Sequence, residues 1–452
     1  MEQQPRIILL SGGSGTRLWP LSNGTRAKQF LQLLPAPDGT TESMLQRIVR
    51  QLREAGLGDS ITVATSLAQR DIVCNQLDEQ VSFITEPDHR GTLPAICLAA
   101  LRMAESGVGA DETVVVMPTD AFAGADYFRV MARMAAAVPT TQDSIVLMGV
   151  RPTYPSTKYG YIVPTAAQYE PEAVLPVAKF VEKPALPAAE VLFGSGALWN
   201  GGVFAMRLGY LLEVAARTFG HPTYDSLYTR YATLPKLSFD VEVLEKAERM
   251  LVVPFLGQWK DLGTWNTLLE ETPVTTSGNV LVGQDVEHTH IINELDQPLL
   301  CVGTHGMIVA ATSDGILVCR KELSESIKHD VGKLAVRPMY EERRWGTYKV
   351  INNLTFADGA KALTKLLCIK AGKNISYQIH RHRDEIWTFV DGEGRLVLDG
   401  REQRVGRGDV VRIAAGTLHA VRAISDLQII EVQTGDQLIE EDIERFPWSW
   451  ES

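Results

Sequence analysis

The sequence is poor in cysteine, in long apolar runs and in excess positive charge. Its five cysteines are an odd number and widely spaced, which argues against a framework of disulfides. No stretch approaches the roughly 18 uninterrupted apolar residues that a membrane-spanning helix needs, and the longest candidate is broken by Arg102. Forty-four Lys and Arg against 55 Asp and Glu give a net charge of −11, which argues against broad nucleic-acid binding. The N-terminal residues lack a secretory signal, so we expect a cytoplasmic protein with neither nucleic-acid nor membrane partners.

What is present fits a multidomain globular enzyme. At about 150 residues per domain, 452 residues predict about three units, which we place at 1–275, 276–335 and 336–452. β-Rich runs alternate with helical patterns over the first 150 residues, which predicts an α/β fold with a doubly wound, mostly parallel sheet. The predicted strands are 6–11, 60–66, 81–87, 113–120 and 144–151. Ligands bind such sheets at the carboxyl ends of the strands.

The remaining two units read as β structure. Short β-rich runs broken by Gly, Asp and Asn predict a small β module over 276–335. Beyond residue 343 an all-β pattern punctuated by glycines predicts a compact barrel or jelly roll.

A glycine-rich turn follows the first predicted strand. Glycines let the backbone approach an anion, and Arg17 and Lys28 add positive charge for phosphate oxygens. The motif is neither a P-loop nor a dinucleotide-binding loop, because Leu18 stands where the latter needs glycine. The candidate nucleotide-binding residues of this turn are Gly12, Gly13, Ser14, Gly15, Thr16 and Arg17.

Eight segments in order, beginning with GGSGTRLWPLSN…AKQF, resemble the sugar-1-phosphate nucleotidylyltransferases, and most closely the mannose-1-phosphate guanylyltransferases. The other seven are 86–96, 117–120, 159–162, 180–184, 198–204, 238–240 and 259–265. The resemblance implies a GT-A-like sheet and the Mg²⁺-dependent reaction of GTP with mannose 1-phosphate. A sugar phosphate attacks the α-phosphorus and pyrophosphate leaves, so positioning and charge neutralisation suffice without a protein nucleophile.

The resemblance also implies roles for single residues. Asp120 and Asp261 match the pair that holds Mg²⁺, for which carboxylate oxygens are suitable ligands. Arg17, Lys28, Asp120 and Asp261 form the expected catalytic set. The expected sugar-phosphate contacts are Gly160, Glu182, Lys183 and Asn200, and Thr92 in the 86–96 segment is an expected nucleotide contact.

Several positions depart from the family pattern. Asn23 replaces an Arg, Ala27 a Pro, Gly91 an Asn and Ala121 a His. We expect Asn23 and Gly91 to lie in segments that contact the nucleotide. These two departures therefore weaken the inference that guanine is the base of the nucleotide. An alternative is therefore a transferase for another sugar-1-phosphate, such as that of a heptose or fucose.

The C-terminal pattern predicts a metal site. His380 and His382, two residues apart, point to one face of a strand, and Glu385 and the distant His419 complete three nitrogens and a carboxylate. The spacing resembles the cupin motifs, and the surrounding segments resemble type II phosphomannose isomerase. That resemblance implies interconversion of fructose 6-phosphate and mannose 6-phosphate with a divalent metal such as Zn, Fe, Mn or Co.

This domain departs from its family too. Arg381, Ile386, Arg344 and Ala414 replace a His, a His and two Pro. Because Ile386 removes a possible proton-transfer group, a non-catalytic sugar-binding or assembly cupin stays open as an alternative. We also expect a homo-oligomer.

Overall fold

The computed structural model describes residues 4–13, 15–77, 81–140, 145–166, 168, 170–272, 275–334, 337–440 and 442–450. By their contacts the residues divide into two compact units. The first unit contains residues 1–18 and 27–274, and the second contains 19–26 and 275–452. The short segment 19–26 thus belongs to the C-terminal unit although the chain on both sides of it belongs to the first.

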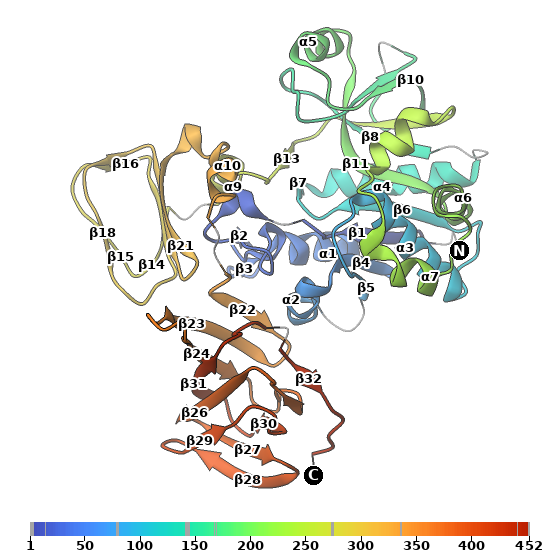
Figure 1. The fold of residues 1–452 in the computed structure, drawn as a ribbon. Helices are drawn as coiled ribbons and strands as arrows, with labels where there is room; N and C mark the ends of the chain where they lie inside the picture. Colours follow the sequence, from blue (N-terminus) through green and yellow to red (C-terminus); the bar gives the residue numbers. More distant parts are fainter. Residues whose placement is uncertain are drawn as a thin grey trace. The chain divides into compact units, whose positions relative to one another are not determined.

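A nine-stranded sheet forms the centre of the first unit (Figure 1), in the order β5-β4-β1-β6-β11-β8-β12-β10-β9. β10 and β11 run against the other strands, so the sheet is mostly parallel, as predicted. The five predicted strands are all present, with ends that differ by at most two residues. The bounds are Arg6–Leu10 (β1), Ile61–Ser66 (β4), Ser82–Glu86 (β5), Thr113–Pro118 (β6), Ile145–Val150 (β8), Tyr161–Pro164 (β9), Leu175–Val181 (β10), Leu198–Arg207 (β11) and Met250–Phe255 (β12).

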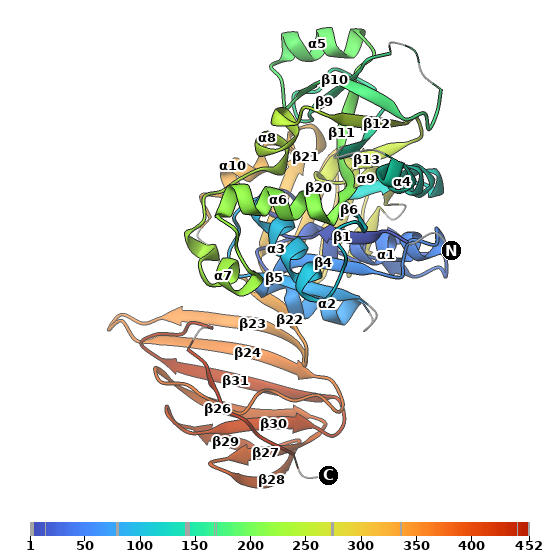
Figure 2. The ribbon, with the colours of Figure 1, turned by 90° about the vertical axis from the view of Figure 1, so that its right-hand side faces the viewer.

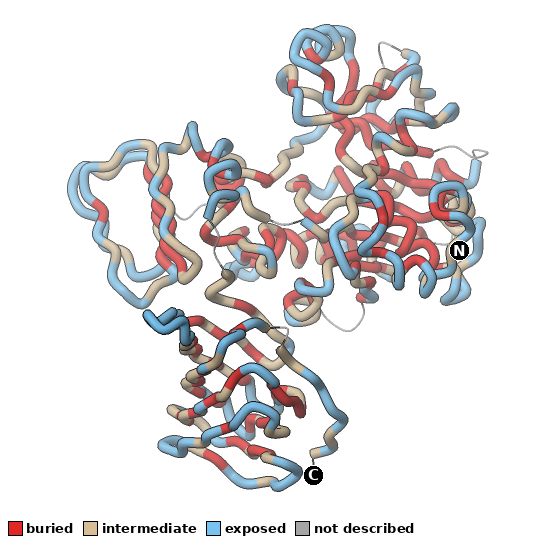
Figure 3. The backbone as a smooth tube through the Cα atoms, viewed as in Figure 1, coloured by how far each residue is buried: buried red, intermediate tan, exposed pale blue. Residues whose placement is uncertain are grey.

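Helices cover both faces of this sheet, because its strands are apolar on both sides. Ile7 and Leu9 of β1 join the core beneath one group of helices, and Ile8 between them joins the core beneath the other. Buried residues follow the strands in Figure 3. The first group is Met44–Glu54 (α1), Arg70–Gln76 (α2) and Ala125–Ala137 (α4). The second, seen in Figure 2, is Thr92–Glu105 (α3), Leu208–Phe219 (α6) and Tyr224–Thr229 (α7).

A small ribbon lies apart from the main sheet. β7 (Ala121–Ala123) pairs antiparallel with β13 (Trp259–Asp261), and Ala121 lies opposite Asp261. Because Asp120 immediately precedes β7, this register brings two acidic residues together that are 141 positions apart in the chain. The unit is completed by β2 (Leu34–Pro35), β3 (Thr41–Glu42), α5 (Leu186–Gly194), α8 (Phe239–Glu242) and α9 (Trp265–Glu271).

The β module of the second unit is a parallel coil. Strands from successive turns pair in parallel, β14 with β17, β17 with β20, β15 with β18, and β16 with β19. β21 then closes the largest sheet in antiparallel fashion. The bounds are Thr276–Gly278 (β14), Val280–Val282 (β15), Val286–Glu287 (β16), His290–Asn293 (β17), Leu299–Cys301 (β18), Thr304–His305 (β19), Met307–Thr312 (β20), Gly315–Arg320 (β21) and Ile327–Val331 (α10).

Two antiparallel sheets form the C-terminal barrel, the predicted cupin fold. Their orders are β22-β23-β24-β31-β26-β29 and β28-β27-β30-β25-β32. Burial alternates along β24, β26 and β31, so every second side chain faces the interior. The bounds are Tyr340–Arg343 (β22), Gly346–Thr355 (β23), Lys361–Ile369 (β24), Gln378–Ile379 (β25), Arg383–Asp391 (β26), Glu393–Leu398 (β27), Arg401–Gly406 (β28), Val410–Ile413 (β29), His419–Ala423 (β30), Leu427–Gly435 (β31) and Glu444–Arg445 (β32).

No helix among the described residues is long and apolar enough to cross a membrane. All five cysteines are free thiols.

Candidate active sites

The glycine-rich turn leaves the carboxyl end of β1, between the ends of β4 and β6. Its backbone is held by Gln29, whose amide donates to the Ser11 carbonyl at 2.7 Å, and by Gln69, which donates to the Gly13 carbonyl at 3.1 Å. Gly15 has a φ of +62°, and a Cβ there would lie 2.8 Å from Ala27 Cα. Only glycine fits this close approach, which sets the turn directly against the backbone before Lys28.

The other predicted nucleotide contacts fall in three places. Gly12 and Gly13 belong to this turn, whereas Ser14 lies outside the described residues. Thr16 and Arg17 begin a short 3₁₀ turn, and Arg17 is exposed. Thr92 starts α3, where its hydroxyl accepts a hydrogen bond from the Phe239 amide at 2.8 Å, so this hydroxyl ties two backbone segments together.

Lys28 lies between the two predicted metal ligands. Its ammonium group donates to Asp120 Oδ2 at 2.7 Å and lies 3.5 Å from Asp261 Oδ1. Gly263 leaves room for this arrangement, because a Cβ there would lie 2.8 Å from Asp261 Oδ1. Three of the four predicted catalytic residues therefore meet at one point, beyond the carboxyl ends of β1 and β6.

The charges in this cluster depend on one another. Burial alone would lower the pKa of Lys28, but Asp120 and Asp261 overcome that effect and hold it above the ordinary value. Burial opposes ionisation of Asp120, yet the charge of Lys28 keeps its pKa lowered. Burial and the neighbouring Asp120 both raise the pKa of Asp261. The positive charge of Arg17 also acts on all three groups. Two carboxylates that converge on one cation supply the oxygen donors that Mg²⁺ prefers.

A second cluster unites three of the predicted sugar contacts. A Cβ on Gly160 would lie 2.5 Å from Glu182 Oε2 and 3.3 Å from Asn200 Cβ, so these side chains face a gap that only glycine leaves open. Glu182 Oε2 is buried without a hydrogen-bond partner among the described residues. Burial raises the pKa of Glu182, against the effect of Lys183. An unpaired carboxylate oxygen beside a carboxamide suits the hydroxyl groups of a sugar.

Lys183 lies at the edge of this cluster. It is 61% exposed, donates to Glu182 at 2.7 Å and has a φ of +39°, in the left-handed region. Asp240 is a member of the cluster that the sequence reasoning did not single out. Its carboxylate accepts a hydrogen bond from the Asn200 amide at 2.7 Å, and it lies in the 238–240 segment that matched the family without a role.

The two departures near the nucleotide segments have local explanations. Gly91 has a φ of +88°, and a Cβ there would lie 2.3 Å from the Leu237 carbonyl, which leaves no room for the Asn of the family pattern. Asn23 is bound by Asp314 of the C-terminal unit at 2.6 Å. The expectation that Asn23 bears on the base of the nucleotide therefore has no support in the geometry.

Inside the barrel, His380, Glu385 and His419 are buried, with ligand atoms all within 4.8 Å of one another. His380 Nε2 lies 3.3 Å and His419 Nε2 3.7 Å from Glu385. Nδ1 of His380 faces the Asp442 carbonyl, and Nδ1 of His419 faces the Thr417 carbonyl at 2.9 Å. Because a carbonyl only accepts, both Nδ1 atoms carry hydrogen, so in the neutral rings both Nε2 atoms present lone pairs toward the carboxylate.

The electrostatics of these residues suit a metal. Burial lowers the pKa of both His380 and His419, against the charge of Glu385, and so favours the neutral imidazole that metals bind. Burial opposes ionisation of Glu385, but neighbouring positive charge, including the Arg383 guanidinium that donates to it at 2.9 Å, holds its pKa below the ordinary value. Two nitrogens and one carboxylate oxygen fit a divalent transition metal.

His382 does not join the cluster, contrary to the prediction. Its side chain is 47% exposed and lies 4.0 Å from Asp436. The prediction assumed one continuous strand, but β25 ends at Ile379 and β26 begins at Arg383, so alternation of side chains does not apply across the turn. Gln378 lies near the cluster instead, with its amide 3.3 Å from His380 Nε2. The i, i+2 spacing of Gln378 and His380 was a signal available in the sequence.

Position 386 also differs from the expectation. Ile386 is 39% exposed, whereas its neighbours Glu385 and Trp387 are buried. Residue 386 therefore lies on the outer face of β26. A histidine at this position would point away from the metal cluster inside the barrel. The interior holds Glu431 instead, linked to Glu385 by Trp387, whose indole nitrogen lies 3.1 Å from an oxygen of each. Burial and the charge of Glu385 raise the pKa of Glu431 to about 8.

Comparison with known proteins finds one family match in each half of the chain. Residues 6–278 match the family model described as nucleotidyl transferase, and residues 335–447 match the one described as mannose-6-phosphate isomerase C-terminal. The chain is 30% identical to the alginate biosynthesis protein AlgA of Pseudomonas putida, over 97% of this chain and 95% of that protein. It is also 30% identical to the mannose-1-phosphate guanylyltransferase of Escherichia coli, over 97% of each chain.

A solved structure from Thermus thermophilus, described as mannose-1-phosphate geranyltransferase, matches with a TM-score of 0.60 and 29% identity. The match covers 73% of this chain and 99% of that one. The chain belongs to the nucleotidyl transferase family. More narrowly, it is a member of the mannose-1-phosphate guanylyltransferase family in which a mannose-6-phosphate isomerase domain follows the transferase.

Proposed function

We propose that the first unit transfers the guanylyl group of GTP to mannose 1-phosphate. A phosphate oxygen of the sugar phosphate forms a bond to the α-phosphorus, the bond from that phosphorus to the bridging oxygen breaks, and pyrophosphate leaves with the electron pair. The convergence of Lys28, Asp120 and Asp261 beside the glycine-rich turn carries the proposal.

Each residue has a defined task in this proposal. Asp120 and Asp261 would hold Mg²⁺, which neutralises charge on the triphosphate when bound. Lys28 and Arg17 supply positive charge to the phosphates, and the backbone of Gly12 and Gly13 approaches them closely.

The sugar phosphate would occupy the second cluster. Glu182 and Asn200 accept and donate hydrogen bonds to its hydroxyl groups, and Asp240 holds the Asn200 amide in place. Lys183 would pair with the phosphate, since its exposed ammonium group is bound only by Glu182 among the described residues.

The test is release of pyrophosphate in a matrix of four nucleoside triphosphates against mannose, glucose, heptose and fucose 1-phosphates. The proposal expects GTP with mannose 1-phosphate to be the best pair. Asp120→Asn and Asp261→Asn should each abolish turnover, whereas Asp111→Asn, at a 96% exposed aspartate, should not. Preference for another sugar phosphate would support the alternative of a transferase for that sugar. No turnover with any pair would reject the proposed transfer reaction.

For the barrel we infer mannose-6-phosphate isomerase activity. His380, Glu385 and His419 would hold a divalent metal that polarises the sugar carbonyl when bound, and Gln378 is the neighbouring side chain that can add a fourth donor. Conversion of fructose 6-phosphate should require added metal and be lost in His380→Ala. His382→Ala is the matched control and should keep the activity, because its ring lies outside the cluster. Metal binding without conversion would favour a sugar-binding barrel.

A further inference from the structure

Residues 19–26, which we call the strap, lie in the middle of the transferase motif but pack on the C-terminal unit. At one end, Trp19 covers Gly315 so closely that a Cβ on that glycine would lie 2.4 Å from the indole ring. Next to it, the Pro20 carbonyl accepts a hydrogen bond from Thr312 at 3.1 Å. These contacts fix the start of the strap to β20 and β21.

The side chain of Asn23 both stabilises the turn within the strap and binds the strap to Asp314. Its side-chain oxygen accepts hydrogen bonds from the amides of Thr25 and Arg26 at 2.9 and 2.7 Å, which shapes the turn. Its side-chain nitrogen donates to Asp314 at 2.6 Å. Asp314 is fixed in turn, because its other oxygen accepts from the Met339 amide at 2.6 Å.

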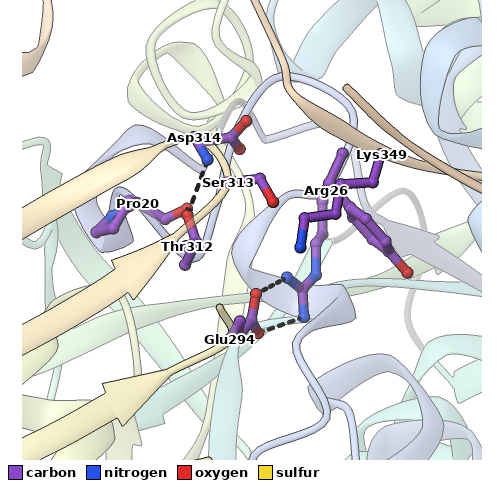
Figure 4. Close-up of a pocket in the computed structure, with 8 residues that line it drawn as sticks. Pro20, Arg26, Glu294, Thr312, Ser313, Asp314 and Lys349 are labelled. Atoms are coloured by element: carbon purple, nitrogen blue, oxygen red, sulfur yellow. Dashed lines mark hydrogen bonds and ion pairs between the residues drawn. The ribbon is translucent and has the colours of Figure 1, made fainter. Parts of the chain in front are cut away.

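Arg26 holds the far end of the strap. Its guanidinium makes two hydrogen bonds to Glu294, at 2.8 and 3.0 Å, and lies 5.6 Å from the centre of the Tyr340 ring. Arg26 and Glu294 are among the residues that line a cavity of about 260 Å³, and Figure 4 shows the two hydrogen bonds between them. A bidentate pair of this kind fixes direction as well as distance.

The strap is short, and its neighbours in the chain are the residues of the transferase site. Arg17 precedes Trp19 by two positions, and Lys28 follows Arg26 by two. Two residues of extended chain span at most about 7 Å. A shift of either end of the strap is therefore passed along the backbone to Arg17 or Lys28.

We propose that Asn23 and Asp314 are positioning residues for the transferase: by holding the strap, the C-terminal unit sets the geometry of Arg17 and Lys28. The inference rests on the proposed transfer reaction. It predicts that a residue some 40 positions beyond the transferase unit controls turnover without touching substrate.

The experiment is a polarity swap in the full-length chain. Asn23→Asp keeps the oxygen that shapes the turn but sets a carboxylate against Asp314. Asp314→Asn keeps the acceptor for Met339 but sets a second amide against Asn23. In the double variant Asn23→Asp/Asp314→Asn, donor and acceptor exchange sides and the contact is restored. Asp330→Asn, at an exposed carboxylate of the same unit, is the control.

Three measurements are made on each variant: steady-state kinetics of pyrophosphate release (kcat and KM), the isomerase rate, and hydrogen exchange of the Leu18, Phe30 and Leu31 amides. These amides bond to Gly15, Ala27 and Lys28 at the two ends of the strap. We expect kcat/KM for GTP to fall about tenfold to a hundredfold in each single variant, as small misplacements of reacting groups do, with faster exchange at these amides. The double variant should return to within about threefold of the wild type.

The isomerase rate should stay unchanged in every variant. A parallel loss of isomerase rate, or no rescue by the double variant, would overturn the positioning role and leave only a loss of stability. Unchanged turnover in Asn23→Asp would overturn it directly. If the wild type transferred no nucleotide, the proposed function would fall, and the exchange of the three amides would still decide whether the pair holds the strap.

Discussion

The ammonium group of Lys28 donates to Asp120 at 2.7 Å, and this bond joins the segment that packs against the glycine-rich turn after β1 to the end of β6. Two neighbouring parallel strands thus contribute opposite charges to one point at their carboxyl ends. Such a place, where the chain order of the strands reverses, is where open α/β sheets bind their ligands.

Removing the cation from this pair should stop the transfer. We expect Lys28→Met to lower kcat for pyrophosphate release by at least about a hundredfold, because it removes charge stabilisation where the triphosphate reacts. Lys246→Met, at an exposed lysine paired with Glu242, should leave kcat unchanged. Near-normal turnover in Lys28→Met would show that this lysine is structural.

Glu86 gives the first unit a pH-dependent stability. Burial raises its pKa from 4.5 to about 7, although the Tyr231 hydroxyl donates to it at 2.6 Å. An acid whose pKa is higher in the folded state favours folding less as pH rises from about 4.5 to about 7, because only the unfolded chain ionises freely. Glu86→Gln should therefore gain about 1–3 kcal/mol in free energy of unfolding relative to wild type between pH 5 and pH 8, by urea denaturation. A difference that does not change with pH would contradict the assignment.

Two contributions to the stability cost of replacing Gly91 can be measured separately: the steric clash of a Cβ and the positive φ angle. Gly91 and Gly107 have φ of +88° and +89°, but a Cβ meets the Leu237 carbonyl at 2.3 Å in the first and open space in the second. Gly107→Ala should cost about 1 kcal/mol for the angle alone. Gly91→Ala should cost about 2 kcal/mol more, since the 237 backbone must move. Equal losses in thermal unfolding would mean that residue 237 yields easily.

Restoring the family residue at position 386 should not change the isomerase. Ile386→His places an imidazole on the outer face of β26, away from the metal cluster. The rate of fructose 6-phosphate conversion should stay within about twofold of wild type, a small effect typical of surface positions. A clear gain would show that the outer face takes part in catalysis.

The strands of the first unit were predictable because each is a buried run bounded by turn residues. The pairing of Asp120 with Asp261 followed from family resemblance, and its structural cause, the β7–β13 ribbon, is three residues long and carries no periodic signal. His382 was misplaced because a turn interrupts the strand pattern between Ile379 and Arg383. The attachment of Asn23 was not predictable, since nothing local in either segment marks a contact across 291 residues.

The separation of Asn23 and Asp314 by 291 positions in the chain has a consequence for the synthesis of the protein. Ribosomes add about 5–20 residues per second, so the strap emerges roughly 15–60 s before Asp314 exists to receive it. During that interval the nascent first unit can fold its sheet, but the strap lacks the partners in β20 and β21 that hold it in the finished protein. Under the proposed positioning role, a chain that terminates before Asp314 should transfer nucleotide at the lowered rate expected of the single variants, and full activity should follow only once β20 and β21 have been translated.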